Sequence, residues 1–144
     1  MRFMILVKAS QNTEAGIMPS RELLEEMGKF NEELVKAGVM KAGEGLRPSS
    51  KAARVHFSGS NRSVTPGPFS GERGLICGYW IWEAKSMDEA INWARRCPNP
   101  TGQEGELEIR QLMELEDFGP ELSAELCQRE KELRRQTQGA AACK

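Results

Sequence analysis

This sequence has few residues of the kinds that usually hold metal ions or perform catalysis. It contains one histidine and four cysteines, and no two of the cysteines form a C-x-x-C pair. This spacing favours free thiols, and we expect no metal site, no disulfide framework and no cofactor. The sequence also lacks the run of about 20 apolar residues that a membrane-spanning helix needs, so we expect no membrane partner.

Neither sign of charge dominates the sequence. Its 20 lysines and arginines are balanced by 21 acidic residues, for a net charge of −1. Proteins that bind nucleic acid through a strong positive field have an excess of basic residues, so we expect no direct nucleic-acid partner. The apolar part of the opening segment MRFMILVKAS is about five residues, too short for a signal peptide. We therefore expect a cytoplasmic protein whose first strand is this segment.

The rest of the pattern predicts an α+β domain. Strand signals occur in five places: 3–7, 39–46, a hairpin at 53–67, 75–85 and 106–112. Two amphipathic helices fall between them, one beginning after Ser20 and one after Ser86, because both serines suit an N-cap. The order gives two strand–helix–strand units in series. That order predicts an antiparallel sheet in the ferredoxin-like split β-α-β arrangement.

An antiparallel sheet with both helices on one face leaves its other face uncovered. Alternation along strand 75–85 places Trp80 and Trp82 on one face, and Tyr79 and Ile81 on the other. We expect one of the tryptophans to lie on the uncovered face, where it needs a partner to leave water. The sequence therefore predicts a homodimer with the two sheets facing each other.

The pattern changes near residue 119 to that of a mostly polar helix. Leu122, Leu126 and Leu133 share one face of this helix, and Glu125–Arg129 and Glu130–Arg134 are spaced as i, i+4 ion pairs. We predict a ferredoxin-like domain at 1–118, followed by a helical extension with a frayed tail at 119–144.

Three segments carry a resemblance to a known family: GEGL (43–46), VTPGPFSGERGLICGYWIWEAKSMDEAINWARRCP (64–98) and GELEIRQL (105–112). They resemble the YCII-related proteins, in particular the DGPF-domain branch, and the resemblance runs from about Phe3 to Leu112. It implies a dimeric α/β-barrel fold of ferredoxin-like subunits. DGPF proteins are often encoded beside extracytoplasmic-function sigma factors, which suggests a link to regulation. Some relatives are lyases that act on chlorinated aromatics.

The chain departs from the family pattern in the loop at 66–73. The family's D-G-P-F is Pro66-Gly67-Pro68-Phe69 here, and its usual E-T-K-E is Gly71-Glu72-Arg73-Gly74. The aspartate is absent, so this protein does not use a catalytic aspartate at that position. Two prolines still fix the backbone of the loop. We expect the loop to form the edge of a cleft, with Phe69 plugging the core below it.

Several residues are candidates for ligand binding at this cleft. Arg73 and Glu72 can orient a polar or anionic ligand, because a guanidinium group binds carboxylates with two hydrogen bonds. Phe69, Trp80 and Trp82 can form apolar walls, although tryptophans on a strand more often belong to a core or an interface.

The candidates for catalysis are weaker. Glu44, between two glycines, would be a base if it were partly buried, as would Glu72 or His56 if either reached the cleft. The alternatives are a surface glutamate and a structural histidine. Three functions stay open: binding of a small molecule, a lyase or hydrolase acting on a small polar or aromatic compound, and a protein-interaction module.

Overall fold

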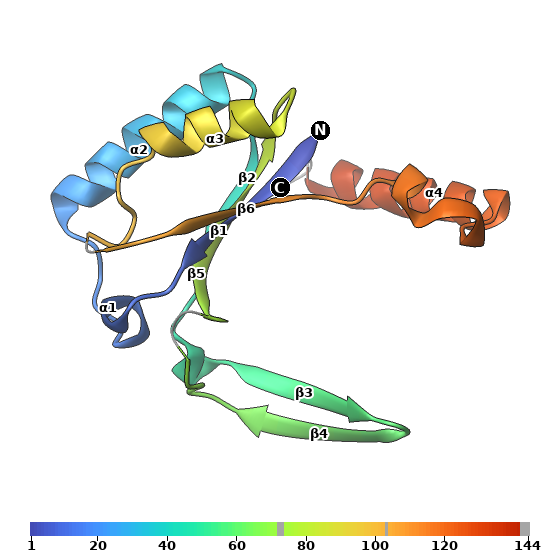
Figure 1. The fold of residues 1–144 in the computed structure, drawn as a ribbon, viewed down its shortest axis with the longest axis horizontal. Helices are drawn as coiled ribbons and strands as arrows, with labels where there is room; N and C mark the ends of the chain where they lie inside the picture. The colour runs from blue at the N-terminus through green and yellow to red at the C-terminus, as the bar shows by residue number, and fades with distance from the viewer. Residues whose placement is uncertain (72–73, 103, 142–144) are drawn as a thin grey trace. The chain divides into compact units, whose positions relative to one another are not determined.

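The computed structural model describes residues 1–71, 74–102 and 104–141. The chain divides into two compact units, Met1–Leu112 and Met113–Lys144 (Figure 1). None of the helices in these described ranges is long and apolar enough to cross a membrane.

The first unit is built on a four-stranded antiparallel sheet. Its strands, in the order β2-β5-β1-β6 across the sheet, are Met40–Gly45, Ile76–Glu83, Arg2–Lys8 and Leu107–Gln111. Helix α2 (Arg21–Lys36) connects β1 to β2, helix α3 (Met87–Arg96) connects β5 to β6, and both lie on one face of the sheet (Figure 1). The predicted α+β class and split β-α-β order are confirmed.

Local sequence explains where the two long helices begin and end. The Ser20 hydroxyl accepts a hydrogen bond from the Leu23 N–H at 3.1 Å, and the Ser86 hydroxyl accepts one from the Glu89 N–H at 3.2 Å. Each serine satisfies a backbone donor that the first helical turn leaves free. Gly38 follows α2 with a φ of 71°, a left-handed conformation that glycine adopts without strain.

The core lies between the sheet and these helices. Side chains of β1 alternate, so Phe3, Ile5 and Val7 are buried while Met4 and Leu6 are half-buried. In the register of the sheet, Phe3 lies opposite Trp82 and Ile5 opposite Trp80. Helix α2 adds Phe30, whose ring centroid is 6.5 Å from that of Trp80 and 6.2 Å from that of Trp82 in edge-to-face geometry.

The prediction that a tryptophan lies on the uncovered face is wrong. Trp82 is 0% exposed and Trp80 is 7% exposed. Both share the face of Phe3 and Ile5, and the helices cover that face. The opposite face of the sheet instead carries a half-buried apolar set: Met4, Leu6, Tyr79 and Ile81.

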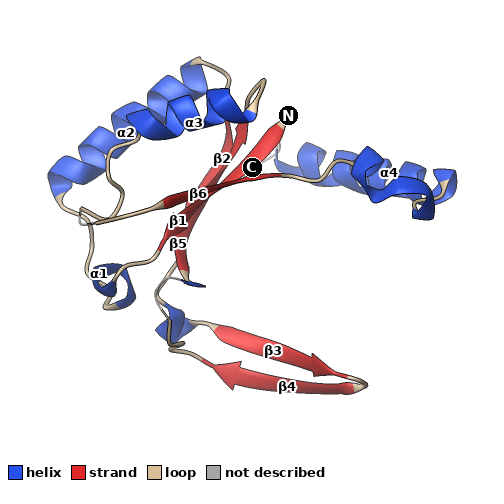
Figure 2. Cartoon of the chain, in the orientation of Figure 1, coloured by secondary structure: helices blue, strands red, loops and turns tan. Residues whose placement is uncertain are grey.

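Strands β3 (Ala53–Ser58) and β4 (Asn61–Pro66) form a separate two-stranded sheet (Figure 2). The predicted hairpin is confirmed, but every residue of both strands is exposed. Val55 pairs with Val64, and Phe57 pairs with Arg62, whose guanidinium carbon lies 4.5 Å from the centre of the Phe57 ring. One side of the hairpin is therefore apolar and exposed.

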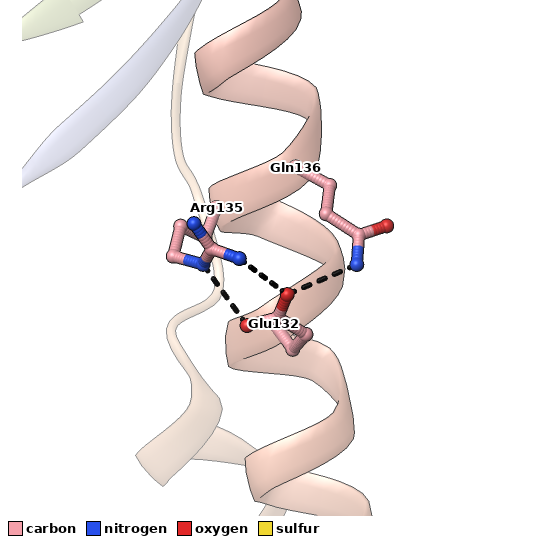
Figure 3. Close-up of polar contacts among 3 residues, drawn as sticks. All are labelled: Glu132, Arg135 and Gln136. Atoms are coloured by element: carbon pink, nitrogen blue, oxygen red, sulfur yellow. Dashed lines mark hydrogen bonds and ion pairs between the residues drawn. The ribbon is translucent and has the colours of Figure 1, made fainter.

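The second unit contains a 3-10 segment (Leu115–Glu121) and helix α4 (Ala124–Ala141). Within the described part of the second unit, neither predicted i, i+4 ion pair forms. Glu132 instead accepts hydrogen bonds from Arg135 and Gln136 (Figure 3), and these bonds hold the pKa of Glu132 below its usual value. Arg134 lies 3.4 Å from Glu114 rather than pairing with Glu130, because its guanidinium reaches back to the segment before the helix.

Candidate functional site

A cleft of about 940 Å³ lies within the first unit, between helix α2, strands β2 and β5, and the segment 46–51. Its walls are largely apolar, and they include Val7, Ile17, Met18, Leu24, Met27 and Trp80. This volume falls in the range of about 300–1,000 Å³ that is typical of small-molecule sites.

One wall of the cleft is held by a buried serine. Helix α1 (Gln11–Glu14) is capped by Ser10, and its last residue, Glu14, lines the cleft. The Glu14 carboxylate accepts hydrogen bonds from the backbone N–H of Ser49 at 3.1 Å and from its hydroxyl at 2.5 Å. Ser49 is 7% exposed, so these charge-assisted bonds satisfy a polar group out of water and fix the segment 46–51.

The proline-rich loop, of which residues 66–71 are described, is hydrogen-bonded to the segment that forms this wall. Gly67 donates its N–H to the Ala52 carbonyl at 2.8 Å, and Phe69 donates its N–H to the Ser49 hydroxyl at 3.0 Å. A Cβ atom at Gly67 would lie 1.7 Å from the Ser49 carbonyl oxygen, so only glycine fits there. The loop is thus joined to the cleft through the backbone of its residues 67–69.

Phe69 is not the core plug that the sequence predicted. Its side chain is half-buried and lies outside the core cluster. The Arg54 guanidinium carbon stands 3.8 Å from the centre of the Phe69 ring, a cation–π distance. The ring therefore packs toward the base of the β3–β4 hairpin, and the Phe69 backbone, rather than its ring, connects the loop to Ser49.

A polar side chain is oriented beside the apolar wall. The Trp80 indole N–H donates to Asn31 Oδ1 at 3.0 Å, and Asn31 comes from helix α2. This bond sets which end of the amide is the acceptor, so the Asn31 NH₂ group keeps its two donors. Trp80 packs directly on Gly43, where an added Cβ would lie 2.6 Å from the indole ring. This packing leaves no room for a side chain at position 43.

The cleft also contains a thiol. Cys77 is half-buried, and its Sγ lies 3.7 Å from the Lys8 carbonyl oxygen. Burial raises the pKa of Cys77, the neighbouring Glu14 carboxylate raises it further, and a hydrogen bond with Thr13 opposes the change. The thiol stays protonated near neutral pH, and a protonated thiol is a poor nucleophile.

The structure separates the predicted ligand-binding residues. Trp80 lines the cleft, whereas Trp82 lies in the core and does not line it. Phe69 acts on the cleft only through Ser49. Glu72 and Arg73 lie outside the described residues.

The predicted catalytic candidates are also separated. Glu44 lines the cleft but is exposed rather than partly buried. Its partner in the register is Tyr79, so its side chain belongs to the sheet face opposite Trp80. His56 is exposed on β3, opposite Ser63 in the hairpin, and does not line the cleft.

Sequence reasoning missed seven polar residues of the cleft, which are Thr13, Glu14, Asn31, Arg47, Ser50, Lys51 and Cys77. For one of them a signal existed. Asn31 follows Met27 by four positions, so it is a polar residue beside the apolar stripe of a helix. In the described ranges, no group of three or more histidine, cysteine, aspartate or glutamate side chains could hold a metal ion.

The fold and cleft define a small α+β domain, and the comparisons give its family. This chain belongs to the YCII-related domain family, whose profile matches residues 1–116. An uncharacterized protein of Rhizobium meliloti (strain 1021) is 27% identical over 90 residues, which cover 62% of this chain and 73% of that protein. The 5-chloro-2-hydroxyhydroquinone dehydrochlorinase of Burkholderia phenoliruptrix AC1100, solved in complex with 2,5-dihydroxybenzoquinone, aligns with a TM-score of 0.46 at 14% identity. That alignment covers 81% of this chain and 97% of the dehydrochlorinase chain.

Proposed function

We propose that this protein binds a small, mainly apolar molecule in the cleft between α2, β2, β5 and the segment 46–51. The observation that carries the proposal is the Asn31–Trp80 hydrogen bond at the wall of an apolar cleft of about 940 Å³. It places an oriented amide beside an aromatic ring, and a few oriented polar groups among apolar walls are typical of ligand sites.

The chemistry of the lining favours binding over turnover. The described residues that line the cleft include no histidine, and burial keeps the Cys77 thiol protonated. Both oxygens of Glu14 already accept hydrogen bonds from Ser49. A lyase or hydrolase activity stays a prediction that depends on Glu44 or on the loop at 72–73.

A variant that fills the cleft tests this proposal. Gly45 lines the cleft and lies opposite Gly78, so its Cα–H points to the same sheet face as Trp80. A Cβ at Gly45 would have no atom within 4 Å. We expect Gly45→Leu to fold normally and to remove the rise in melting temperature that a small-molecule library produces with the natural protein.

Gly28→Leu provides the matched control. Gly28 is an exposed position on α2 that does not line the cleft, and a Cβ there also meets open space. The control should keep every ligand response. Ligands that stabilise the Gly45→Leu variant as strongly as the natural protein would show that the site lies elsewhere.

We also propose that two copies pair through the uncovered face of the sheet. Met4, Leu6, Tyr79 and Ile81 form an apolar stripe on this face, and three ion pairs lie around it, between Lys8 and Glu108, Arg110 and Glu108, and Lys41 and Glu83. An apolar centre with a charged rim is typical of protein interfaces. Because both copies present the same stripe, a two-fold axis can bring the stripes together.

Native mass spectrometry tests the dimer. We expect the natural protein to be a dimer and Ile81→Glu to be a folded monomer, since a buried unpaired charge opposes association. Val35→Glu is the control, because Val35 is 61% exposed on α2, on the other side of the sheet. A natural protein that is monomeric at all concentrations would contradict the proposal.

A cytoplasmic location is supported by the thiols. Cys77, Cys97 and Cys127 are all free in the described chain, as is usual in a reducing compartment. A link to sigma-factor regulation and a protein-binding role for the second unit stay predictions.

A further inference from the structure

Two cations line the cleft without a partner. Arg47 and Lys51 both border it, and neither forms an ion pair with another described residue. Some cations of the first unit are paired: Lys8 with Glu108 at 2.7 Å, Lys41 with Glu83 at 3.2 Å, and Arg96 with Glu33. Among the described residues, Lys29, Lys36, Lys85 and Arg95 are unpaired as well. Arg47 and Lys51 differ from these other unpaired cations in lining the cleft, where both side chains are exposed.

Neither acidic residue of the lining forms an ion pair with these two cations. Glu14 directs one carboxylate oxygen to the N–H of Ser49 and the other to its hydroxyl. Glu44 is exposed and belongs to the sheet face opposite Trp80. Among the polar groups of the lining, Arg47, Lys51 and the NH₂ group of Asn31 offer donors only. The Ser50 hydroxyl can both donate and accept.

The segment that carries the two cations is held in place. Lys51 donates its N–H to the Pro48 carbonyl at 2.9 Å, and Ser49 between them is tied to Glu14 and to the Phe69 N–H. Gly67 closes on the same segment by donating to Ala52. A fixed backbone lowers the entropic cost of binding, because less of the chain has to be ordered around a ligand.

We infer that the ligand of this cleft is an amphiphilic anion, with an apolar body against Trp80, Met27 and Val7 and a carboxylate, sulfonate or phosphate group bound by Arg47 and Lys51. This inference rests on the proposed small-molecule binding and names the chemical class of the ligand. Guanidinium and ammonium groups form short, charge-assisted hydrogen bonds with such anions. The apolar wall would favour ligands with an apolar body, and the two cations would favour ligands with a negative charge.

A matched pair of fluorescent probes tests the inference. Anilinonaphthalene sulfonate has an aromatic body with a sulfonate group, and N-phenylnaphthylamine has the same body without the charge. We expect Arg47→Gln and Lys51→Gln each to weaken binding of the sulfonate by roughly fivefold, the upper range for an exposed ion pair. Binding of the neutral probe should not change. Lys36→Gln is the control, since Lys36 is exposed on α2 and does not line the cleft.

Gly45→Leu separates the outcomes, because only probe bound in the cleft is lost in that variant. Suppose that Gly45→Leu abolishes binding of the sulfonate probe, while the two charge variants and added salt leave its affinity unchanged. The cleft then binds small molecules, and the inference about charge is wrong. If Gly45→Leu leaves both probes bound, the proposed function itself is wrong. Loss of the sulfonate alone in the charge variants, with loss of both probes in Gly45→Leu, would support both.

Discussion

The covered face of β5 and the apolar side of the β3–β4 hairpin have similar residue patterns but opposite surroundings. On β5, Trp82 is 0% exposed, whereas Phe57 of the hairpin is 66% exposed. Strand β5 pairs with β1 and β2 and lies under α2, while β3 and β4 pair only with each other. Alternation of apolar and polar residues therefore predicts a strand, but the topology decides whether its apolar side is covered.

The largest difference between the two regions should appear when one aromatic ring is removed from each. Trp82→Ala should lower the free energy of unfolding by about 3–5 kcal/mol, because it leaves a cavity among Phe3, Phe30 and Trp80. Phe57→Ala should change it by no more than about 0.5 kcal/mol, as is usual for surface positions. Urea denaturation followed by circular dichroism measures both. Equal losses would show that the hairpin side is buried in solution.

A smaller effect is expected from two glycines. Gly67→Ala places a methyl group against the Ser49 carbonyl and should cost about 1–3 kcal/mol, as overpacking usually does. Gly59→Ala in the hairpin turn, where φ is 57°, should cost about 1–2 kcal/mol through backbone strain alone. Only Gly67→Ala should also weaken probe binding in the cleft. The comparison fails if both variants reduce binding to the same extent.

The hydroxyl of Ser49 gives a related test. Ser49→Ala removes the bonds to the Glu14 carboxylate and the Phe69 N–H, so we expect a loss of about 1–3 kcal/mol from unsatisfied buried groups. Ser63→Ala on the exposed hairpin should stay within about 0.5 kcal/mol of the natural protein. Thermal unfolding of the two variants measures this. A Ser49→Ala variant as stable as Ser63→Ala would contradict the role of this bond.

The smallest effect concerns Cys97, which packs against the core at the end of α3. Burial raises the pKa of the Cys97 thiol from 9.0 to about 11. The folded state therefore holds this proton more tightly than the unfolded state does. The protonated Cys97 thiol therefore contributes fully to the free energy of unfolding below pH 9. This contribution decreases as the pH rises from 9.0 to about 11.

Alkylation of Cys97 by iodoacetamide, followed peptide by peptide, should accelerate with a midpoint near pH 11 in the native protein and near the ordinary thiol value in denaturant. A native midpoint near 9.0 would show that the thiol is not desolvated.

The elements of the first unit were predictable because their signals are local. The N-caps Ser20 and Ser86, the apolar run of β1 and the alternating polar and apolar residues of β6 each lie within a few residues. The face of the two tryptophans was not predictable in this way, because it depends on the register of β5 with β1. The cleft was predicted beside the proline-rich loop, and of its lining only Trp80 and Glu44 were among the predicted site residues. The Glu14–Ser49 hydrogen bond joins residues that are 35 positions apart, so no local sequence pattern predicts it.

The central claim is that the covered side of the sheet holds the ligand site, and proton–nitrogen correlation spectra of the three tryptophan indoles test it most directly. Anilinonaphthalene sulfonate should shift the Trp80 indole signal strongly, because Trp80 lines the cleft, and leave that of Trp93 on α3 in place. The backbone signals of Val55 and Val64 should also stay fixed. A probe that shifts the hairpin signals and leaves Trp80 unmoved would contradict the account.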